Sequence, residues 1–129
     1  MRNTAFIITL LFLLNSCGST IQLPVSNEVP AAVMTVKQKQ DGNNNFTIKL
    51  TAENLASADR LSPSRATYVV WIETDENGIK NVGQLNPENG EKVDLETVSS
   101  FEPKAIFVTA EDEGNVSLPT GTEITRKSF

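Results

Sequence analysis

Histidine is absent from the sequence, and there is only one cysteine. A single cysteine cannot form an internal disulfide, so a small exported domain with this composition must be held together by its core. The lack of histidine removes the commonest general base and the commonest nitrogen ligand for metals. No Gly-x-Ser-x-Gly nucleophile motif is present either. We therefore predict that the protein is not an enzyme and carries no cofactor.

Positive charge is also scarce, with 11 Lys and Arg against 16 Asp and Glu and a formal net charge of −5. An acidic chain repels nucleic-acid phosphates and anionic lipid head groups. We expect no nucleic-acid partner. The 129 residues suggest one domain, and 39% hydrophobic with 21% charged residues is typical of a globular protein.

The chain has one long hydrophobic run, residues 5–14, preceded by a positive charge at Arg2. About ten residues are too few to cross a bilayer, which takes about 20, but they suit a secretory signal. Residues 14–18, Leu-Asn-Ser-Cys-Gly, resemble the lipobox of bacterial lipoproteins. The resemblance implies that the Cys17 thiol receives a diacylglyceryl group and that cleavage falls just before it. An uncleaved interfacial anchor and a plain secretory signal are the alternatives.

These features divide the chain into three parts. Residues 1–16 form a signal peptide, expected to be helical. Residues 17–30 contain Pro24 and Pro30 among small polar residues and predict a flexible, lipidated tether. Residues 31–129 form the folded domain. No acidic cluster follows Cys17, which favours a periplasm-facing position in the cell envelope, lipid-anchored to a membrane.

The folded domain shows the alternation of half-buried strands rather than a helical period. Asn-Gly at 77–78 lies between two strand patterns and predicts a hairpin. About seven short strands separated by turns indicate an antiparallel β-sandwich. The residues expected to share a face within each strand are Ala32, Met34 and Val36; Phe46, Ile48 and Leu50; Tyr68, Val70 and Ile72; Val69 and Trp71; Val93 and Leu95.

Several segments between about residues 55 and 124 resemble, in order, the extracytoplasmic C-terminal domain of the anti-sigma-K factor family. They are residues 68–72 (Tyr-Val-Val-Trp-Ile), 75–78 (Asp-Glu-Asn-Gly), Gly83, 107–111 (Phe-Val-Thr-Ala-Glu), Gly114 and 119–121 (Pro-Thr-Gly). The resemblance implies an immunoglobulin-like sandwich and an envelope location. The chain departs from the family at residues 111–115, where Glu-Asp-Glu-Gly-Asn replaces the usual Glu-Pro-Ala-Gly-Gly. It also has no cytoplasmic sigma-binding segment and no transmembrane helix, so anti-sigma activity is not implied.

Three groups of residues are candidate sites. Trp71 and Tyr68 suit either a binding platform or the core, and we expect the core, with the tyrosine hydroxyl bonded to the backbone. The oxygen-bearing side chains of residues 111–115 (Glu111, Asp112, Glu113 and Asn115) and of residues 75–77 are expected to be solvated turns, with calcium binding as the alternative. Paired carboxylates also occur in glycosidases, but a catalytic pair must be held in a fixed constellation.

The sequence therefore predicts a membrane-anchored envelope lipoprotein that acts as a non-catalytic protein-interaction or sensing module. Its expected partners are the membrane, through the lipid on Cys17, and another envelope protein. A lipoprotein that binds calcium or a glycan through residues 111–121 is the alternative.

Overall fold

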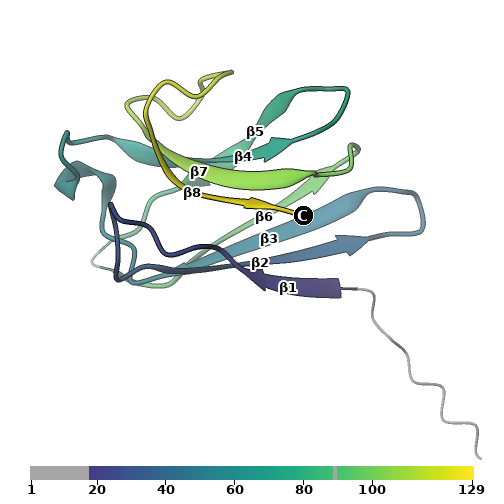
Figure 1. The fold of residues 1–129 in the computed structure, drawn as a ribbon, viewed down its shortest axis with the longest axis horizontal. Coiled ribbons are helices and arrows are strands. Elements are labelled where there is room, and N and C mark those ends of the chain that lie inside the picture. The colour runs from purple at the N-terminus through teal and green to yellow at the C-terminus, as the bar shows by residue number, and fades with distance from the viewer. Residues whose placement is uncertain (1–17, 89) are drawn as a thin grey trace, which may run out of the picture.

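The computed structural model describes residues 18–88 and 90–129 (Figure 1). The predicted signal peptide, its helix and the lipidated Cys17 lie outside these residues. The described chain forms eight strands and one short 3-10 turn: β1 (Gly18–Gln22), β2 (Val33–Gln40), β3 (Phe46–Glu53), η1 (Ala58–Arg60), β4 (Thr67–Glu73), β5 (Ile79–Leu85), β6 (Val93–Ser99), β7 (Ala105–Glu111) and β8 (Thr122–Ser128).

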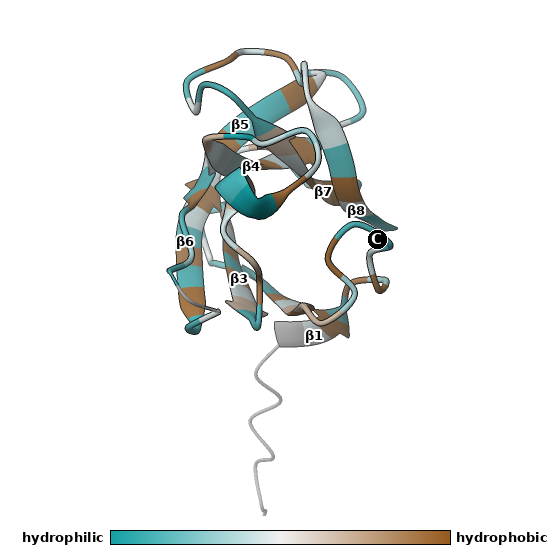
Figure 2. Ribbon diagram, turned by 90° about the vertical axis from the view of Figure 1, so that its left-hand side faces the viewer, coloured by the Kyte–Doolittle hydropathy of each residue, from teal (hydrophilic) through white to brown (hydrophobic). Residues whose placement is uncertain are grey.

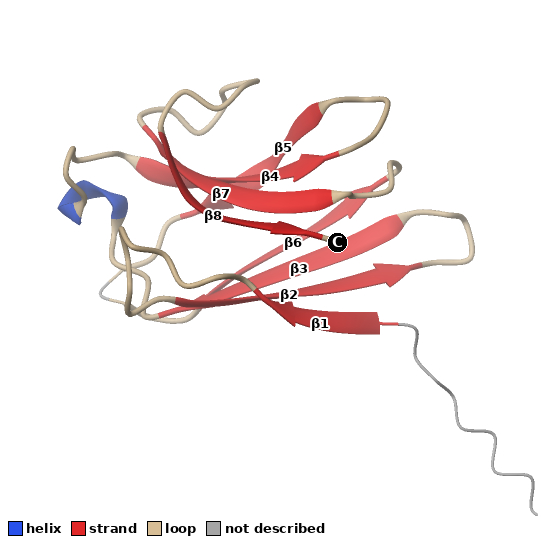
Figure 3. Cartoon of the chain, in the orientation of Figure 1, coloured by secondary structure: helices blue, strands red, loops and turns tan. Residues whose placement is uncertain are grey.

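The strands form two four-stranded antiparallel sheets that pack face to face (Figure 3). Sheet A has the order β1-β2-β3-β6, and sheet B the order β5-β4-β7-β8. The chain crosses between the sheets three times, so β6 returns beside β3 and β7 returns beside β4. Figure 2 looks along the sandwich with η1 nearest the viewer and shows the two layers. The architecture confirms the expected immunoglobulin-like β-sandwich.

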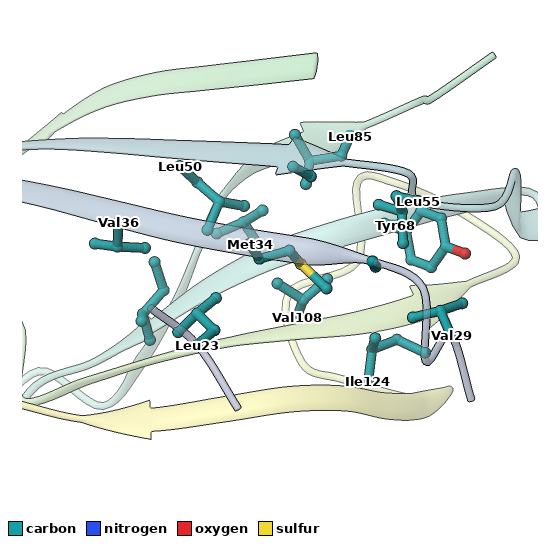
Figure 4. Packing of buried hydrophobic residues seen from close by; sticks show 14 of the residues in the cluster. Leu23, Val29, Met34, Val36, Leu50, Leu55, Tyr68, Leu85, Val108 and Ile124 are labelled. Carbon is teal, nitrogen blue, oxygen red and sulfur yellow. The ribbon is translucent and has the colours of Figure 1, made fainter. Parts of the chain in front are cut away.

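Side-chain alternation sends one face of each sheet into the main core (Figure 4). Met34 and Val36 of β2 meet Ile48 and Leu50 of β3, and all four are at most 3% exposed. The predicted inward faces are confirmed for β2 and β4 and for Ile48 and Leu50 of β3, whereas Phe46 is half-buried and lies outside the main core. The core positions of β4 and β7 are Tyr68, Val70, Ile72, Ile106, Val108 and Ala110.

Residues 18–30 differ from the predicted flexible tether. Strand β1 pairs with β2 over its whole length, from Gly18 opposite Lys39 to Gln22 opposite Thr35. Leu23 is 3% exposed and belongs to the main core. The expectation of a tether rested on Pro24 and Pro30 among small polar residues and on the absence of an apolar period. A five-residue edge strand carries little of that signal, and its pairing partner lies 13 to 21 residues further along the chain.

The continuation of this segment closes one side of the sandwich. The Thr125 hydroxyl of β8 donates to the Pro24 carbonyl at 2.8 Å, which joins the segment to sheet B. Val29 is 4% exposed and packs in the main core, while the buried Ser26 hydroxyl accepts from the Val29 backbone N–H at 3.4 Å. The folded domain therefore includes most of the predicted tether.

The connections gather at two ends of the sandwich. The end at which β1 begins, here the Gly18 end, carries the loops at 41–45, 74–78 and 100–104. The opposite end carries the connections at 23–32, 54–66, 86–92 and 112–121. Among the described residues, no helix has the length and apolar character needed to cross a membrane.

Candidate functional site

The two aromatic residues that the sequence singles out are both core residues. Tyr68 faces the main core with no exposed surface, and its hydroxyl donates to the Ala56 carbonyl at 2.6 Å. Burial, together with the negative charge of Asp59, raises the pKa of Tyr68 to about 12. Trp71 lies on the other face of β4 and is also fully buried. Neither ring is presented to solvent as a binding platform.

Trp71 is buried because the 112–121 loop folds over the outer face of sheet B. Trp71 stacks with Phe107 at a ring-centroid distance of 6.0 Å, and Val116 of the loop packs against them. The Asn81 side-chain amide of β5 donates to the carbonyls of Gly114 and Val116, both at 2.9 Å. The loop is therefore a cover for a second, smaller core.

The loop is fastened at its far end by Glu111, whose side chain has no exposed surface. Its carboxylate accepts from the backbone N–H of Thr120 at 3.0 Å and of Gly121 at 3.0 Å, and from the Thr120 hydroxyl at 2.6 Å. There is no room for a side chain at Gly121, since a Cβ there would clash with the Ala110 carbonyl oxygen. These contacts fix the turn that leads into β8.

The charged state of Glu111 is maintained by these donors. Burial alone raises the pKa of a carboxyl, but hydrogen bonds from the hydroxyls of Thr109 and Thr120 and from the backbone of Gly121 and Thr120 outweigh it and lower the pKa of Glu111. The Thr109 hydroxyl also accepts from the indole N–H of Trp71 at 2.8 Å. A series of hydrogen bonds thus runs beneath the loop from the Trp71 indole through Thr109 to Glu111 and the turn.

The remaining polar side chains of residues 111–115 are not brought together with Glu111. Asp112 turns outward and pairs with Arg65 at 3.1 Å, while Glu113 and Asn115 are exposed. Within residues 18–88 and 90–129, no three metal-ligating side chains converge on one point. Glu111 could act as a ligand only by releasing the turn that it holds.

The second acidic candidate, residues 75–77, is a hairpin tip. The Thr74 backbone N–H donates to the Gly78 carbonyl at 3.0 Å, and the Thr74 hydroxyl accepts from the Asn77 N–H at 3.1 Å. Gly78 has φ of +69°, a conformation that glycine adopts readily, which explains the Asn-Gly signal. Asp75 lies 3.7 Å from the Lys104 ammonium. The residues shape a turn with one surface ion pair.

A surface that the sequence did not single out lies on the outer face of sheet A. Lys37 and Lys39 of β2 and Lys49 of β3 are exposed there and line a shallow groove. Lys37 lies directly opposite Lys49 in the β2–β3 register. We call this surface the lysine face; Thr20, Gln38, Thr47 and Glu96 complete the lining of its groove.

The lysine face carries charge that the fold leaves largely uncompensated. Like charges directly opposite one another in a sheet are destabilising. The nearest carboxylate in the register is that of Glu96, opposite Lys49 in β6. Among the described residues, every ion pair involves Arg65, Lys104 or Arg126, and none involves the three lysines.

Sequence reasoning missed the lysine face because its lysines come from two strands. The sequence does show that Lys37 and Lys39 share one face of a strand, because they are two residues apart. Lys49 joins them only through the strand register, which the sequence alone does not give.

Comparison with protein-family models, with curated proteins and with solved structures found no match to this chain. The resemblance to the anti-sigma-K factor domain and the lipobox interpretation of Cys17 therefore stay predictions.

Proposed function

We propose that the protein is a lipid-anchored lipoprotein of the bacterial cell envelope and acts as a non-catalytic protein-interaction or sensing module. The observation that carries the proposal is the position of β1. Gly18, the residue that follows Cys17, is already paired in the sandwich, so the described residues 18–88 and 90–129 are available as one domain presented beside the anchor. The aromatic residues and Glu111, which the sequence offered as a site, are committed to the fold. Anti-sigma activity is not part of the proposal.

The opposite end of the sandwich is the favoured partner surface. An anchor beside Gly18 is at the other end of the sandwich and leaves this end accessible, and loops on a rigid scaffold commonly carry binding residues. Val25 and Leu118 lie in two of these connections, and their side chains are 67% and 64% exposed. Exposed apolar side chains of this kind suit the centre of a protein interface. Anchoring also raises the effective concentration for a partner in the same membrane, so weak contacts suffice.

An in-cell crosslink tests the proposal. The chain is tagged after Phe129, living cells are crosslinked, and co-purifying envelope proteins are identified by mass spectrometry. We expect one reproducible partner, and we expect Cys17→Ala to move the protein out of the membrane fraction and to lose that partner. Retention of Cys17→Ala in the membrane would contradict the anchor, and an absence of any partner above background would contradict the interaction module.

Paired variants locate the surface. We expect Val25→Asp combined with Leu118→Asp to abolish the crosslink, because charge at the centre of an apolar interface must be desolvated. Phe101→Asp combined with Val98→Asp is the matched control, since it places the same two charges on apolar residues at the Gly18 end that are 39% and 63% exposed. Equal losses in both variants would contradict the assignment of the partner to the opposite end.

A further inference from the structure

We propose that the lysine face docks on anionic phospholipid head groups of the bilayer that holds the anchor, so that the sandwich lies with sheet A toward the membrane. The inference rests on the proposed lipid anchor and adds an orientation to it. Three exposed lysines, Lys37, Lys39 and Lys49, gather on one face of a chain whose net charge is −5.

The position of the anchor is the first argument. Gly18 lies opposite Lys39 and Thr20 opposite Lys37 in the β1–β2 register. Consecutive Cα atoms are about 3.8 Å apart, so an anchor on Cys17 is joined directly to the strand that pairs with β2, which carries Lys37 and Lys39. A lipid on Cys17 therefore brings the lysines to the bilayer surface without any long linker. A patch held there has a high local concentration of head groups.

The distribution of charge along the outer face of sheet A is the second argument. The register sets Lys39 and Val98 in the row next to the Gly18 end, and Lys37 and Lys49 in the next row. Acidic side chains, Asp94 and Glu53, occupy rows further from that end. Glu96 is the one carboxylate in the lysine rows.

Val98 supplies an apolar contact beside these charges. Its side chain is 63% exposed and lies opposite Thr47 on the same outer face. Lysines next to an exposed apolar side chain are the combination found on protein surfaces that contact the interface of an anionic membrane.

The size of the effect follows from simple electrostatics. Each lysine close to an anionic surface contributes a factor of about five to the docked population, so three contribute on the order of a hundredfold. Glu96 and the acidic remainder of the chain reduce this gain. Salt near 1 M shortens the Debye length to about 3 Å and should release the face while the lipid stays inserted.

The test uses the full protein purified from the envelope in detergent and reconstituted into vesicles. One set is pure phosphatidylcholine and the other contains phosphatidylglycerol. A cysteine introduced by Val98→Cys carries an environment-sensitive fluorophore, and Leu118→Cys carries the same label at the opposite end of the sandwich. Acrylamide, a neutral quencher, then measures the exposure of each label. Flotation with the vesicles is recorded separately.

We expect quenching of the Val98 label to fall several-fold in anionic vesicles compared with neutral ones, while the Leu118 label stays exposed in both. The lysine-face variant, with Lys37, Lys39 and Lys49 all changed to Gln, should lose this protection. The matched control removes three positive charges elsewhere, through Lys80→Gln, Lys92→Gln and Lys127→Gln, and should keep it.

Failure of the face and failure of the anchor are distinguishable. If the protein floats with both vesicle types but the Val98 label is equally quenched in both, or is protected in the lysine-face variant as well, the docking proposal is overturned and the anchor stands. If the protein does not float with neutral vesicles, the anchor is wrong. Flotation with anionic vesicles then tests the docking of the lysine face. Flotation that the lysine-face variant loses supports the docking proposal, and an absence of flotation overturns it.

Discussion

Replacing Glu111 by glutamine removes the charge that fastens the covering loop. The glutamine side chain is nearly the same size, but it presents an NH₂ group where the carboxylate has a second oxygen. In the native turn, both carboxylate oxygens accept from the backbone N–H of Gly121, each at 3.0 Å, and from the backbone N–H of Thr120 at 3.0 and 3.3 Å. In Glu111→Gln the one remaining oxygen, at the Oε1 position, can still accept from both backbone donors and from the Thr120 hydroxyl, but these three hydrogen bonds are no longer made to a charged group and the second acceptor is lost.

The magnitude follows from these contacts. A hydrogen bond to a charged group contributes about 1.5–3 kcal/mol and one between neutral groups about 0.5–1.5 kcal/mol, so each of the three hydrogen bonds is weakened by about 1 kcal/mol. We expect Glu111→Gln to lower the free energy of unfolding by about 3 kcal/mol, against a total of about 5–15 kcal/mol for a domain. At about 4 °C per kcal/mol, the melting temperature should fall by about 12 °C.

Thermal and urea unfolding followed by circular dichroism measure this change. Glu113→Gln is the matched control, because it makes the same substitution two residues away on an exposed side chain. The control should remain within about 0.5 kcal/mol of the wild type. If Glu111→Gln is as stable as Glu113→Gln, the carboxylate does not hold the turn and the reasoning fails.

The pH dependence gives a second test of the same residue. The hydrogen bonds lower the pKa of Glu111 in the folded protein below its ordinary value of 4.5, so the unfolded chain takes up the proton first as the pH falls. The stabilisation is present above pH 4.5 and is lost as the pH drops through the folded pKa. The stability difference between the wild type and Glu111→Gln should therefore narrow below pH 4.5.

Three further predictions concern the main core, the turn at Gly121 and the first segment. Tyr68 is the only tyrosine and should titrate near pH 12, as followed by absorbance at 295 nm. The stability that its burial confers should decline as the pH rises from about 10 to 12, because the unfolded chain loses the proton first. A midpoint near 10 in the folded protein would contradict its burial. Gly121→Ala should cost more than about 3 kcal/mol through a backbone clash, whereas Gly42→Ala, with open space around it, should be nearly neutral in the same urea titration. Leu23→Ala should lower the free energy of unfolding by about 2–4 kcal/mol and Val25→Ala by less than about 0.5 kcal/mol. Equal, small effects of the two substitutions would instead support a flexible tether.

Strand alternation was the part of the fold most readable from the sequence. Met34 and Val36, Ile48 and Leu50 repeat every second residue, and a strand with this pattern can bury only one face. The Asn-Gly pair at 77–78 marked its hairpin for an equally local reason, the positive φ of Gly78.

The first strand and the role of Glu111 were not readable. Strand β1 is stabilised by its pairing with β2 and by the burial of Leu23, and both depend on residues distant in the sequence. Glu111 resembled a solvated loop carboxylate because its donors lie nine and ten residues away. Burial of a charge is decided by the groups that the fold brings to it.

Net charge gave a similarly incomplete picture. The excess of acidic residues indicated repulsion from anionic lipids, yet the strand register places three lysines on one face. The sum over the chain is a property of composition, whereas the field near a membrane depends on where each charge lies.

The sequence by itself determined the all-β class, the inward faces of the strands and the hairpin turns, because these depend on residues within a few positions of one another. Only the tertiary structure decided that residues 18–30 belong to the domain, that the 112–121 loop covers Trp71, and that Lys49 lies opposite Lys37. These features arise from contacts between segments distant in the chain, and local propensity carries no information about which distant segments will meet.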